Sequence, residues 1–292
     1  MVERGTYNAE VEGSIPSAPT IYFLFLVYGR LAQWQSDSFT PSRPGVRSLH
    51  RPPFFMLNIQ IIYEDGDLLV INKPSGILTH PKSTNDTDPS VIDWLKSDRP
   101  EILKVGENSL RPGIVHRLDK ETSGLLIIAK NNNSFQYLKN LFQERKIKKT
   151  YLALVHGKLK NKEGIIAASL GRIDSRQTTK IHGRHELKEK EAETDYKVAK
   201  EYTDYSLIKA SPRTGRTHQI RVHLNLIGHP IVCDPLYGGK KKQCPPSLGR
   251  LFLHAQSLSF TAPDGKALSL EADLPQDLQS FLSELDKKQP IS

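Results

Sequence analysis

A polar segment lies between two apolar ones at residues 113–124, GIVHRLDKETSG. His116, Arg117 and Asp119 lie within four residues of one another, and apolar residues resume directly after Gly124. A carboxylate can act as a nucleophile or a base, and a nearby arginine can hold it ionised or bind a phosphate. Asp, Ser, Thr and Gly are also common turn residues, and glycine permits a positive φ. The segment therefore indicates either a reaction site or a charged turn between two strands.

A second cluster of reactive side-chain types occupies residues 145–157, RKIKKTYLALVHG. Its basic residues, including Lys148 and Lys149, come directly before an apolar strand that opens with Tyr151. A basic run of this kind can lie along a phosphate backbone. The alternative is a solvated helix end followed by a packed tyrosine.

A third cluster, residues 211–224, reads SPRTGRTHQIRVHL. Five basic or imidazole side chains fall within eleven residues, at the start of an expected helix: Arg213, Arg216, His218, Arg221 and His223. Guanidinium groups and the free backbone N–H groups of a helix start together suit an anion. An ordinary charged surface helix is the alternative, and the density of the cluster argues against it.

Several enzyme classes are disfavoured by missing motifs. The sequence has no G-x-x-x-x-G-K-[ST] loop for a nucleoside triphosphate, no H-E-x-x-H zinc motif and no G-x-S-x-G elbow. HRLD differs from the kinase H-R-D loop by an inserted leucine, and the other kinase motifs are missing.

Cysteine content and hydropathy bear on the cellular compartment. Cys233 and Cys244 form no C-x-x-C or zinc spacing, so we expect neither a disulfide framework nor a structural metal site, as in a reducing cytoplasm. The longest apolar run, residues 21–28, is too short to span a bilayer, and it lacks the features of a secretory signal. We therefore expect a cytoplasmic protein without a membrane partner.

The net charge of the 292-residue chain is +9. Residues 1–55 contain five basic and four acidic residues, which leaves +8 on residues 56–292. Such an excess favours a polyanionic partner such as nucleic acid.

Residues 1–55 differ in composition from the rest of the chain. They are rich in Ser, Pro, Gly and Arg and show little periodicity, so we expect an unstructured extension. Codons that could encode GSIPSAPT (13–20) and GVRS (45–48) resemble the T-arms of tRNA genes, and those for AQWQS (32–36) resemble a D-arm. We therefore expect residues 1–55 to be the translation of upstream tRNA genes rather than genuine coding sequence, with Met56 as the true start and residues 56–292 as the folded domain.

From Met56 the pattern predicts many strands and few helices. Hairpins are expected around EDGD (64–67), within ETDYKVAKEYTDYSLIKASP (193–212) around a polar turn, and around Pro-Asp-Gly (263–265). GIVH, GLLIIAK, TYLALVHG and GIIAASLG are further strand candidates. Helices are expected at DPSVIDWLKS, SFQYLKNLFQERKI, RTHQIRVHLNLIG and PQDLQSFLSEL, the third capped at Thr214 or Thr217 and ended by Gly228. We read the charged residues 172–193 as a long excursion. The fold class is α+β, a single domain with flanking helices on a mixed, largely antiparallel sheet.

The chain resembles the pseudouridine synthases of the large-subunit, RluA-type family. Five segments carry the resemblance: YEDGDLLVINKPSGILTHP (63–81), PGIVHRLDKETSGLLIIAK (112–130), KKTYLALVHG (148–157), RTGRTHQIRVHLNLIGHPIVCDPLYGG (213–239) and LFLHAQSLSF (251–260). They span about residues 58–285. Residues 1–55 do not resemble the S4-type RNA-binding domain that many members carry, so a core-only member is expected.

The resemblance implies isomerisation of uridine in RNA, without cofactor or metal. It implies that Asp119 is the catalytic carboxylate, Tyr151 the active-site tyrosine and Arg221 the arginine that pairs with Asp119. Arg117 matches the position that helps fill the space of a flipped base. We expect further RNA contacts from these residues: His116, Lys148, Lys149, Arg216 and His218.

The target RNA is left open by the sequence. Large-subunit rRNA is the expected substrate; a tRNA-modifying member of the same family and a non-catalytic RNA-binding module are the alternatives. A carboxylate facing a polyanion argues against the last, because binding alone does not need one. We expect a monomer.

Overall fold

The computed structural model describes residues 59–173, 176–179, 190–239 and 244–288. The expected extension at residues 1–55 and the expected start at Met56 lie outside these residues. The described residues form the predicted α+β fold, in which helices flank a nine-stranded, mostly antiparallel sheet.

The main sheet has the strand order β1-β2-β3-β10-β4-β9-β8-β5, with β11 paired to β10. Within the described part of the chain, β3 and β10 form the one parallel pair, and every other pair is antiparallel. A separate hairpin is formed by β6 and β7. The strands are β1 (Gln60–Glu64), β2 (Leu68–Lys73), β3 (Ser123–Ala129), β4 (Lys148–His156), β5 (Glu163–Ala167), β6 (Leu170–Ile173), β7 (Arg176–Thr179), β8 (Glu193–Glu201), β9 (Tyr205–Pro212), β10 (Leu253–Thr261) and β11 (Ala267–Glu271).

The three predicted hairpins are confirmed as β1–β2, β8–β9 and β10–β11. In the first turn, one carboxylate oxygen of Asp65 accepts hydrogen bonds from the backbone N–H groups of Asp67 (2.8 Å) and Leu68 (2.7 Å). This is the turn chemistry expected of an aspartate that bonds to the backbone just after it.

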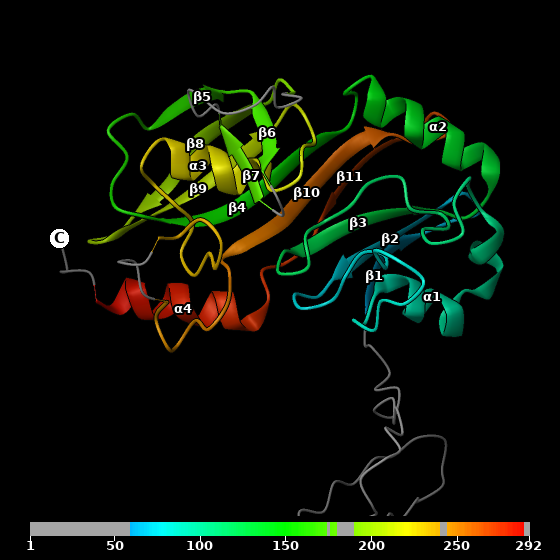
Figure 1. Ribbon diagram of the computed structural model, residues 1–292, viewed down its shortest axis with the longest axis horizontal. Coiled ribbons are helices and arrows are strands. Elements are labelled where there is room, and N and C mark those ends of the chain that lie inside the picture. The colour runs from blue at the N-terminus through cyan, green and yellow to red at the C-terminus, as the bar shows by residue number, and fades with distance from the viewer. Residues whose placement is uncertain (1–58, 174–175, 180–189, 240–243, 289–292) are drawn as a thin grey trace, which may run out of the picture. The chain divides into compact units, whose positions relative to one another are not determined.

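The four predicted helices are also present, and none in the described part of the chain has the length and apolar character needed to cross a membrane. Ser90 caps the first in a capping box with Asp93, and Asn131 caps the second. Figure 1 shows α1 and α2 beside β1–β3, and α3 and α4 on the side of β4 and β9. The helices are α1 (Val91–Asp98), the short 3₁₀ helix η1 (Pro100–Lys104), α2 (Asn132–Gln143), α3 (Gln219–Leu226) and α4 (Gln276–Lys287).

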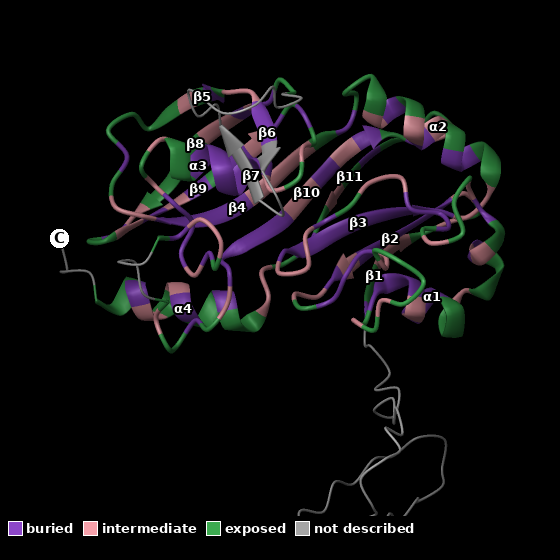
Figure 2. Ribbon diagram, in the orientation of Figure 1, coloured by how far each residue is buried: buried purple, intermediate pink, exposed green. Residues whose placement is uncertain are grey.

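The buried apolar side chains form two main clusters that meet in the middle of the sheet. One joins β1–β3 to α1 and α2, and the other joins β4 and β9 to α3 and α4. β10 contributes to both, and Tyr151 on β4 packs against both. Figure 2 shows buried residues along β3 and exposed ones on the outer sides of α1, α2 and α4. The join between the two halves is therefore the place where residues from both can meet.

Two local predictions are wrong. Residues 113–116 form a loop whose one bridge to the sheet joins Ile114 to Ile128, rather than a strand. Helix α3 has His218 at its N-cap, with φ +54° and no side-chain cap, whereas a cap at Thr214 or Thr217 was expected. Gly228 follows the helix with φ +82°, as predicted for a glycine that ends a helix.

The expectation of no disulfide is also wrong, because Cys233 and Cys244 are bonded to each other. Their separation of eleven residues carries no sequence signature that predicts the bond. The expected excursion at 172–193 includes most of the β6–β7 hairpin, and the rest of it lies largely outside the described residues.

Candidate active site

The loop that precedes β3 carries Asp119, and the segment after β2 holds this loop in place. Thr79 Oγ1 donates to the carbonyl of Leu118 (2.9 Å) and accepts from its N–H (3.1 Å). The buried ammonium of Lys73 donates to the carbonyl of Lys120 (3.3 Å). Backbone groups on both sides of Asp119 are thus bonded to a neighbouring element, which limits the movement of its carboxylate.

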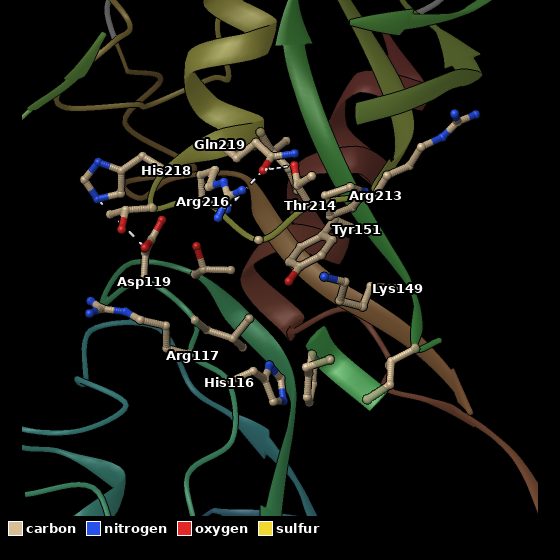
Figure 3. A pocket seen from close by; sticks show the side chains of 18 of the residues that line it. His116, Arg117, Asp119, Lys149, Tyr151, Arg213, Thr214, Arg216, His218 and Gln219 are labelled. Carbon is tan, nitrogen blue, oxygen red and sulfur yellow. Dashed lines mark hydrogen bonds and ion pairs between the residues drawn. The ribbon is translucent and has the colours of Figure 1, made fainter. Parts of the chain in front are cut away.

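The carboxylate of Asp119 faces two nitrogens from the α3 region. His218 Nε2 lies 3.8 Å from Oδ1, and Arg221 Nη1 lies 3.7 Å from Oδ2. Figure 3 shows His218 and Asp119 pointing toward each other. Both distances exceed that of a normal hydrogen bond. The Asp119 side chain is 15% exposed, so its oxygens have favourable charge nearby and remain accessible.

Arg221 forms a long ion pair with Asp119, at 3.7 Å, and its bidentate partner is a different carboxylate. Its Nε and Nη2 each donate to Asp234, both at 2.8 Å, and the side chains of the two residues are 1% and 0% exposed. Burial opposes the charge of Arg221, and the hydrogen bonds and charge of Asp234 outweigh burial, so the pKa of the guanidinium is raised. Arg221 therefore stays a cation inside the protein.

Tyr151 reaches the same place from β4, at the join between the two apolar clusters. Burial raises the pKa of its hydroxyl, and the nearby charge of Asp119 raises it further. The phenol is consequently protonated near neutral pH. Figure 3 shows its ring beside Lys149, with the hydroxyl directed toward the space between the two halves.

These residues line a cavity of about 480 Å³. Ligand pockets in proteins are commonly about 300–1,000 Å³, so the volume suits a small planar group such as a base. Arg117, Lys149, Arg213, Arg216 and Gly215 also line it, together with apolar atoms of Leu118 and Phe142. The described residues include no group of three or more His, Cys, Asp or Glu side chains placed to hold a metal ion.

The comparison with a protein family identifies the chain. The family model described as RNA pseudouridylate synthase matches residues 67–226, which include Asp119, Tyr151 and Arg221. The chain belongs to this family. It is 38% identical over 233 residues to a Mycoplasma pneumoniae protein named "Uncharacterized RNA pseudouridine synthase MG209 homolog", covering 79% of this chain and 71% of that protein. The predictions of the family and of an RNA pseudouridine synthase are confirmed.

Other pseudouridine synthases agree with this assignment. "Ribosomal large subunit pseudouridine synthase D" of Neisseria meningitidis serogroup B is 40% identical over 78% of this chain, which spans 61% of that protein. "Ribosomal large subunit pseudouridine synthase C" of Haemophilus influenzae is 39% identical, with 78% and 69% covered. Among solved structures, "Human RNA Pseudouridylate Synthase Domain Containing 4" has a TM-score of 0.61 and 25% identity, covering 78% of this chain and 93% of that one.

In this pseudouridine synthase the predicted basic residues separate into two groups. Arg117, Lys149, Arg216 and His218 line the cavity, whereas Lys148 at the exposed start of β4 does not. Burial lowers the pKa of His218, Arg221 acts in the same direction, and Asp119 opposes both.

His116 also lines the cavity, but its ring is held by the protein itself. Its Nε2 accepts the N–H of Ile127 (2.9 Å), and the ring stacks on Phe142 with centroids 4.6 Å apart. Burial lowers its pKa to about 3, and Lys149 contributes to the same shift. Since Nε2 must be unprotonated to accept that bond, His116 is a neutral residue that joins the loop to β3.

Two members of the third cluster are engaged away from Asp119. Arg213 points away from Asp119 (Figure 3) and pairs with Asp195 through Nε (2.7 Å) and Nη2 (2.9 Å). His223 is buried, with Nδ1 3.0 Å from the hydroxyl of Thr194. The density of the cluster had indicated one anion site formed by all five residues. Arg213 and His223 are instead engaged elsewhere.

The sequence analysis missed Asp234 and Tyr237, which hold two of the site residues. Tyr237 places its hydroxyl 3.0 Å from His218 Nδ1, and its ring centroid lies 5.3 Å from the guanidinium carbon of Arg221. Both residues lie in the segment CDPLYGG (233–239), where an aspartate before a proline is typical of a turn but carries no sign of its partner.

Proposed function

We propose that this enzyme converts uridine to pseudouridine in large-subunit rRNA, with Asp119 as the catalytic carboxylate and Tyr151 and Arg221 as its partners. The observation that carries the proposal is the position of the Asp119 carboxylate, partly exposed in a base-sized cavity and 3.7 Å from the Arg221 guanidinium. The names of the Neisseria and Haemophilus relatives support rRNA as the target.

The reaction moves one bond and changes no oxidation state. The C1′–N1 bond breaks, the uracil turns, and C5 joins C1′; the C5 proton leaves to water and N1 gains one. Asp119 acts at the sugar, either by forming an ester at C1′ or by taking the C2′ proton. Both routes need an ionised carboxylate with an available oxygen.

Tyr151 serves as a stacking surface and a hydrogen-bond donor in this proposal. Its raised pKa keeps the phenol protonated, so it is poorly suited to take the C5 proton itself. A protonated phenol at the cavity wall can donate to a carbonyl oxygen of the turning base while its ring restrains the plane of that base.

RNA binding rests on the basic residues of the cavity rim. Arg117 is exposed beside Asp119, and Arg216 and Lys149 line the opposite wall. The target uridine must leave its stack at a cost of a few kcal/mol. We propose that Arg117 occupies the space that it leaves, and that Arg216 and Lys149 bind the flanking phosphates. We further propose a cytoplasmic, metal-independent monomer.

Tritium release from RNA labelled at uridine C5 tests the proposal. Wild-type enzyme should release tritium from large-subunit rRNA, and Asp119→Asn should not release it although it still binds the RNA. Asp264→Asn, in the exposed β10–β11 turn, is the control and should match the wild type. Release by Asp119→Asn would overturn the catalytic role. Release from tRNA alone would overturn the rRNA target, and wild type that binds RNA without release would favour a binding module.

A further inference from the structure

Two of the three guanidinium nitrogens of Arg221 are hydrogen-bonded to Asp234 rather than to Asp119. Nε and Nη2 donate to the two oxygens of Asp234, and the pair is shielded from solvent. Nη1 is also buried and has no hydrogen-bond partner among the described residues. It lies 3.7 Å from Asp119 and 3.8 Å from Glu121. The Arg221 nitrogen that lies toward Asp119 therefore makes no hydrogen bond among the described residues.

Asp234 is itself held in one orientation. Its Oδ1 accepts the N–H groups of Leu236 (2.9 Å) and Tyr237 (3.0 Å) in addition to the bond from Arg221. Its Oδ2 accepts the remaining bond, from Arg221 Nε (2.8 Å). A carboxylate with this many donors is held rigidly, because turning it would break several bonds at a site shielded from solvent.

The Arg221–Asp234 pair limits how Arg221 can bind Asp119. An arginine free to turn would present its fork to the nearest carboxylate and make two parallel hydrogen bonds. Such a pair would occupy both oxygens of Asp119, one of which must attack C1′ or take the C2′ proton. Asp234 prevents it by occupying the fork, so Asp119 receives positive charge at 3.7 Å without a direct bond.

We infer that Asp234 is a positioning residue of the reaction: it holds Arg221 so that a single donor, Nη1, faces Asp119 and the substrate. The inference rests on the proposed roles of Asp119 and Arg221, and it adds a residue that acts through Arg221. It follows that the effect of removing Asp234 on turnover depends on the presence of Arg221.

The test is a double-mutant cycle on turnover. Asp234→Asn should lower kcat roughly 100-fold, the effect expected when a reacting group is misplaced by about 1 Å. The dissociation constant for RNA should change less than about twofold, because Asp234 is buried away from the RNA. In an Arg221→Gln background, measured under single-turnover conditions, Asp234→Asn should have almost no further effect.

A matched control comes from another aspartate–arginine pair of the same geometry. Asp277 accepts from Nε and Nη2 of Arg250 on the surface beside α4, outside the cavity. Asp277→Asn should leave kcat unchanged. If Asp234→Asn does not fold, Asp234→Glu takes its place in the cycle, since it keeps the charge and displaces the carboxylate.

Each outcome decides the inference. A folded Asp234→Asn with wild-type kcat would overturn it. An equal loss with and without Arg221 would also overturn it, because that is the result of a structural role. If the wild type releases no tritium, the proposed function fails and this inference fails with it; a working wild type with an additive cycle refutes the inference alone.

Discussion

Gly124 lies where β3 pairs with β10, and we predict that Gly124→Ala strongly destabilises the protein. The parallel pairing of β3 with β10 consists of two residue pairs, one of which joins Gly124 to Ala255. Gly124 has φ +118°, and a Cβ built there would lie 2.3 Å from the carbonyl oxygen of Ala255 and 2.6 Å from its nitrogen. These contacts are with backbone, so a side-chain rotation cannot relieve them.

The size of the effect follows from two costs. A non-glycine residue in this region of φ costs about 1–3 kcal/mol. Separating two packed backbones costs about 1–3 kcal/mol more, as for other overpacked sites. We therefore expect a loss of about 2–6 kcal/mol, a large part of the roughly 5–15 kcal/mol that stabilises a folded protein.

Two other glycines separate these costs. Gly265 has φ +86° with no atom within 4 Å of its Cβ position, so Gly265→Ala should show the backbone strain alone. Gly66 lies outside that region of φ and is equally open, so Gly66→Ala should change stability by less than about 1 kcal/mol. Urea unfolding, followed by Trp fluorescence, ranks the three variants. Gly124→Ala as stable as Gly265→Ala would refute the close approach of β3 and β10.

Three further predictions concern charge and covalent structure. Burial lowers the pKa of Lys73 to about 7 from an ordinary 10.5. Between these two pH values the unfolded chain keeps a proton on Lys73 that the folded protein has lost. The free energy of unfolding should therefore rise with pH, by up to about 1.4 kcal/mol per pH unit from pH 7 toward 10.5. Urea titrations over that range should show this slope in wild type and lose it in Lys73→Met. The His116 ring should not titrate between pH 5 and 8 by NMR, because its pKa is about 3. The Cys233–Cys244 disulfide should stabilise the oxidised protein by roughly 3 kcal/mol. A thiol assay without reductant should detect no free thiol. The urea midpoints of oxidised and reduced samples should differ for the wild type and coincide for Cys233→Ser.

The elements that the sequence predicted correctly are those governed by local rules. The β10–β11 hairpin is specified by alternating apolar residues around Pro-Asp-Gly, and α2 by its apolar spacing. The segment 113–116 was predicted as a strand by the same rules, but its apolar residues Ile114 and Val115 pack against the β1–β3 cluster from a loop. Gly113 has φ +67° there, with the Ala129 carbonyl and Ile102 within 2.7 Å of a built Cβ, and the short strand-like run contains no sign of either contact.

The site residues also divide into those that local sequence motifs reveal and those that depend on packing between distant segments. Asp119, Tyr151 and Arg221 stand out by type and by their surrounding motifs, and the cavity brings them together. The partners that hold them do not stand out, because a hydrogen bond between distant segments depends on packing rather than on spacing. Thr79, which holds the backbone beside Asp119, lies 39 residues from Leu118, its partner.

A physical argument could nevertheless have predicted a second carboxylate near Arg221. A fully buried guanidinium carries five N–H groups, and leaving most of them without acceptors would cost more than the fold can tolerate. In its proposed role Asp119 must keep an oxygen available to substrate, so it does not supply those acceptors. The other N–H groups of Arg221 therefore need acceptors elsewhere, and a second carboxylate supplies two acceptors together with the opposite charge. In the segment that follows α3, the first candidate is Asp234, and the structure pairs it with Arg221 on the side away from the cavity.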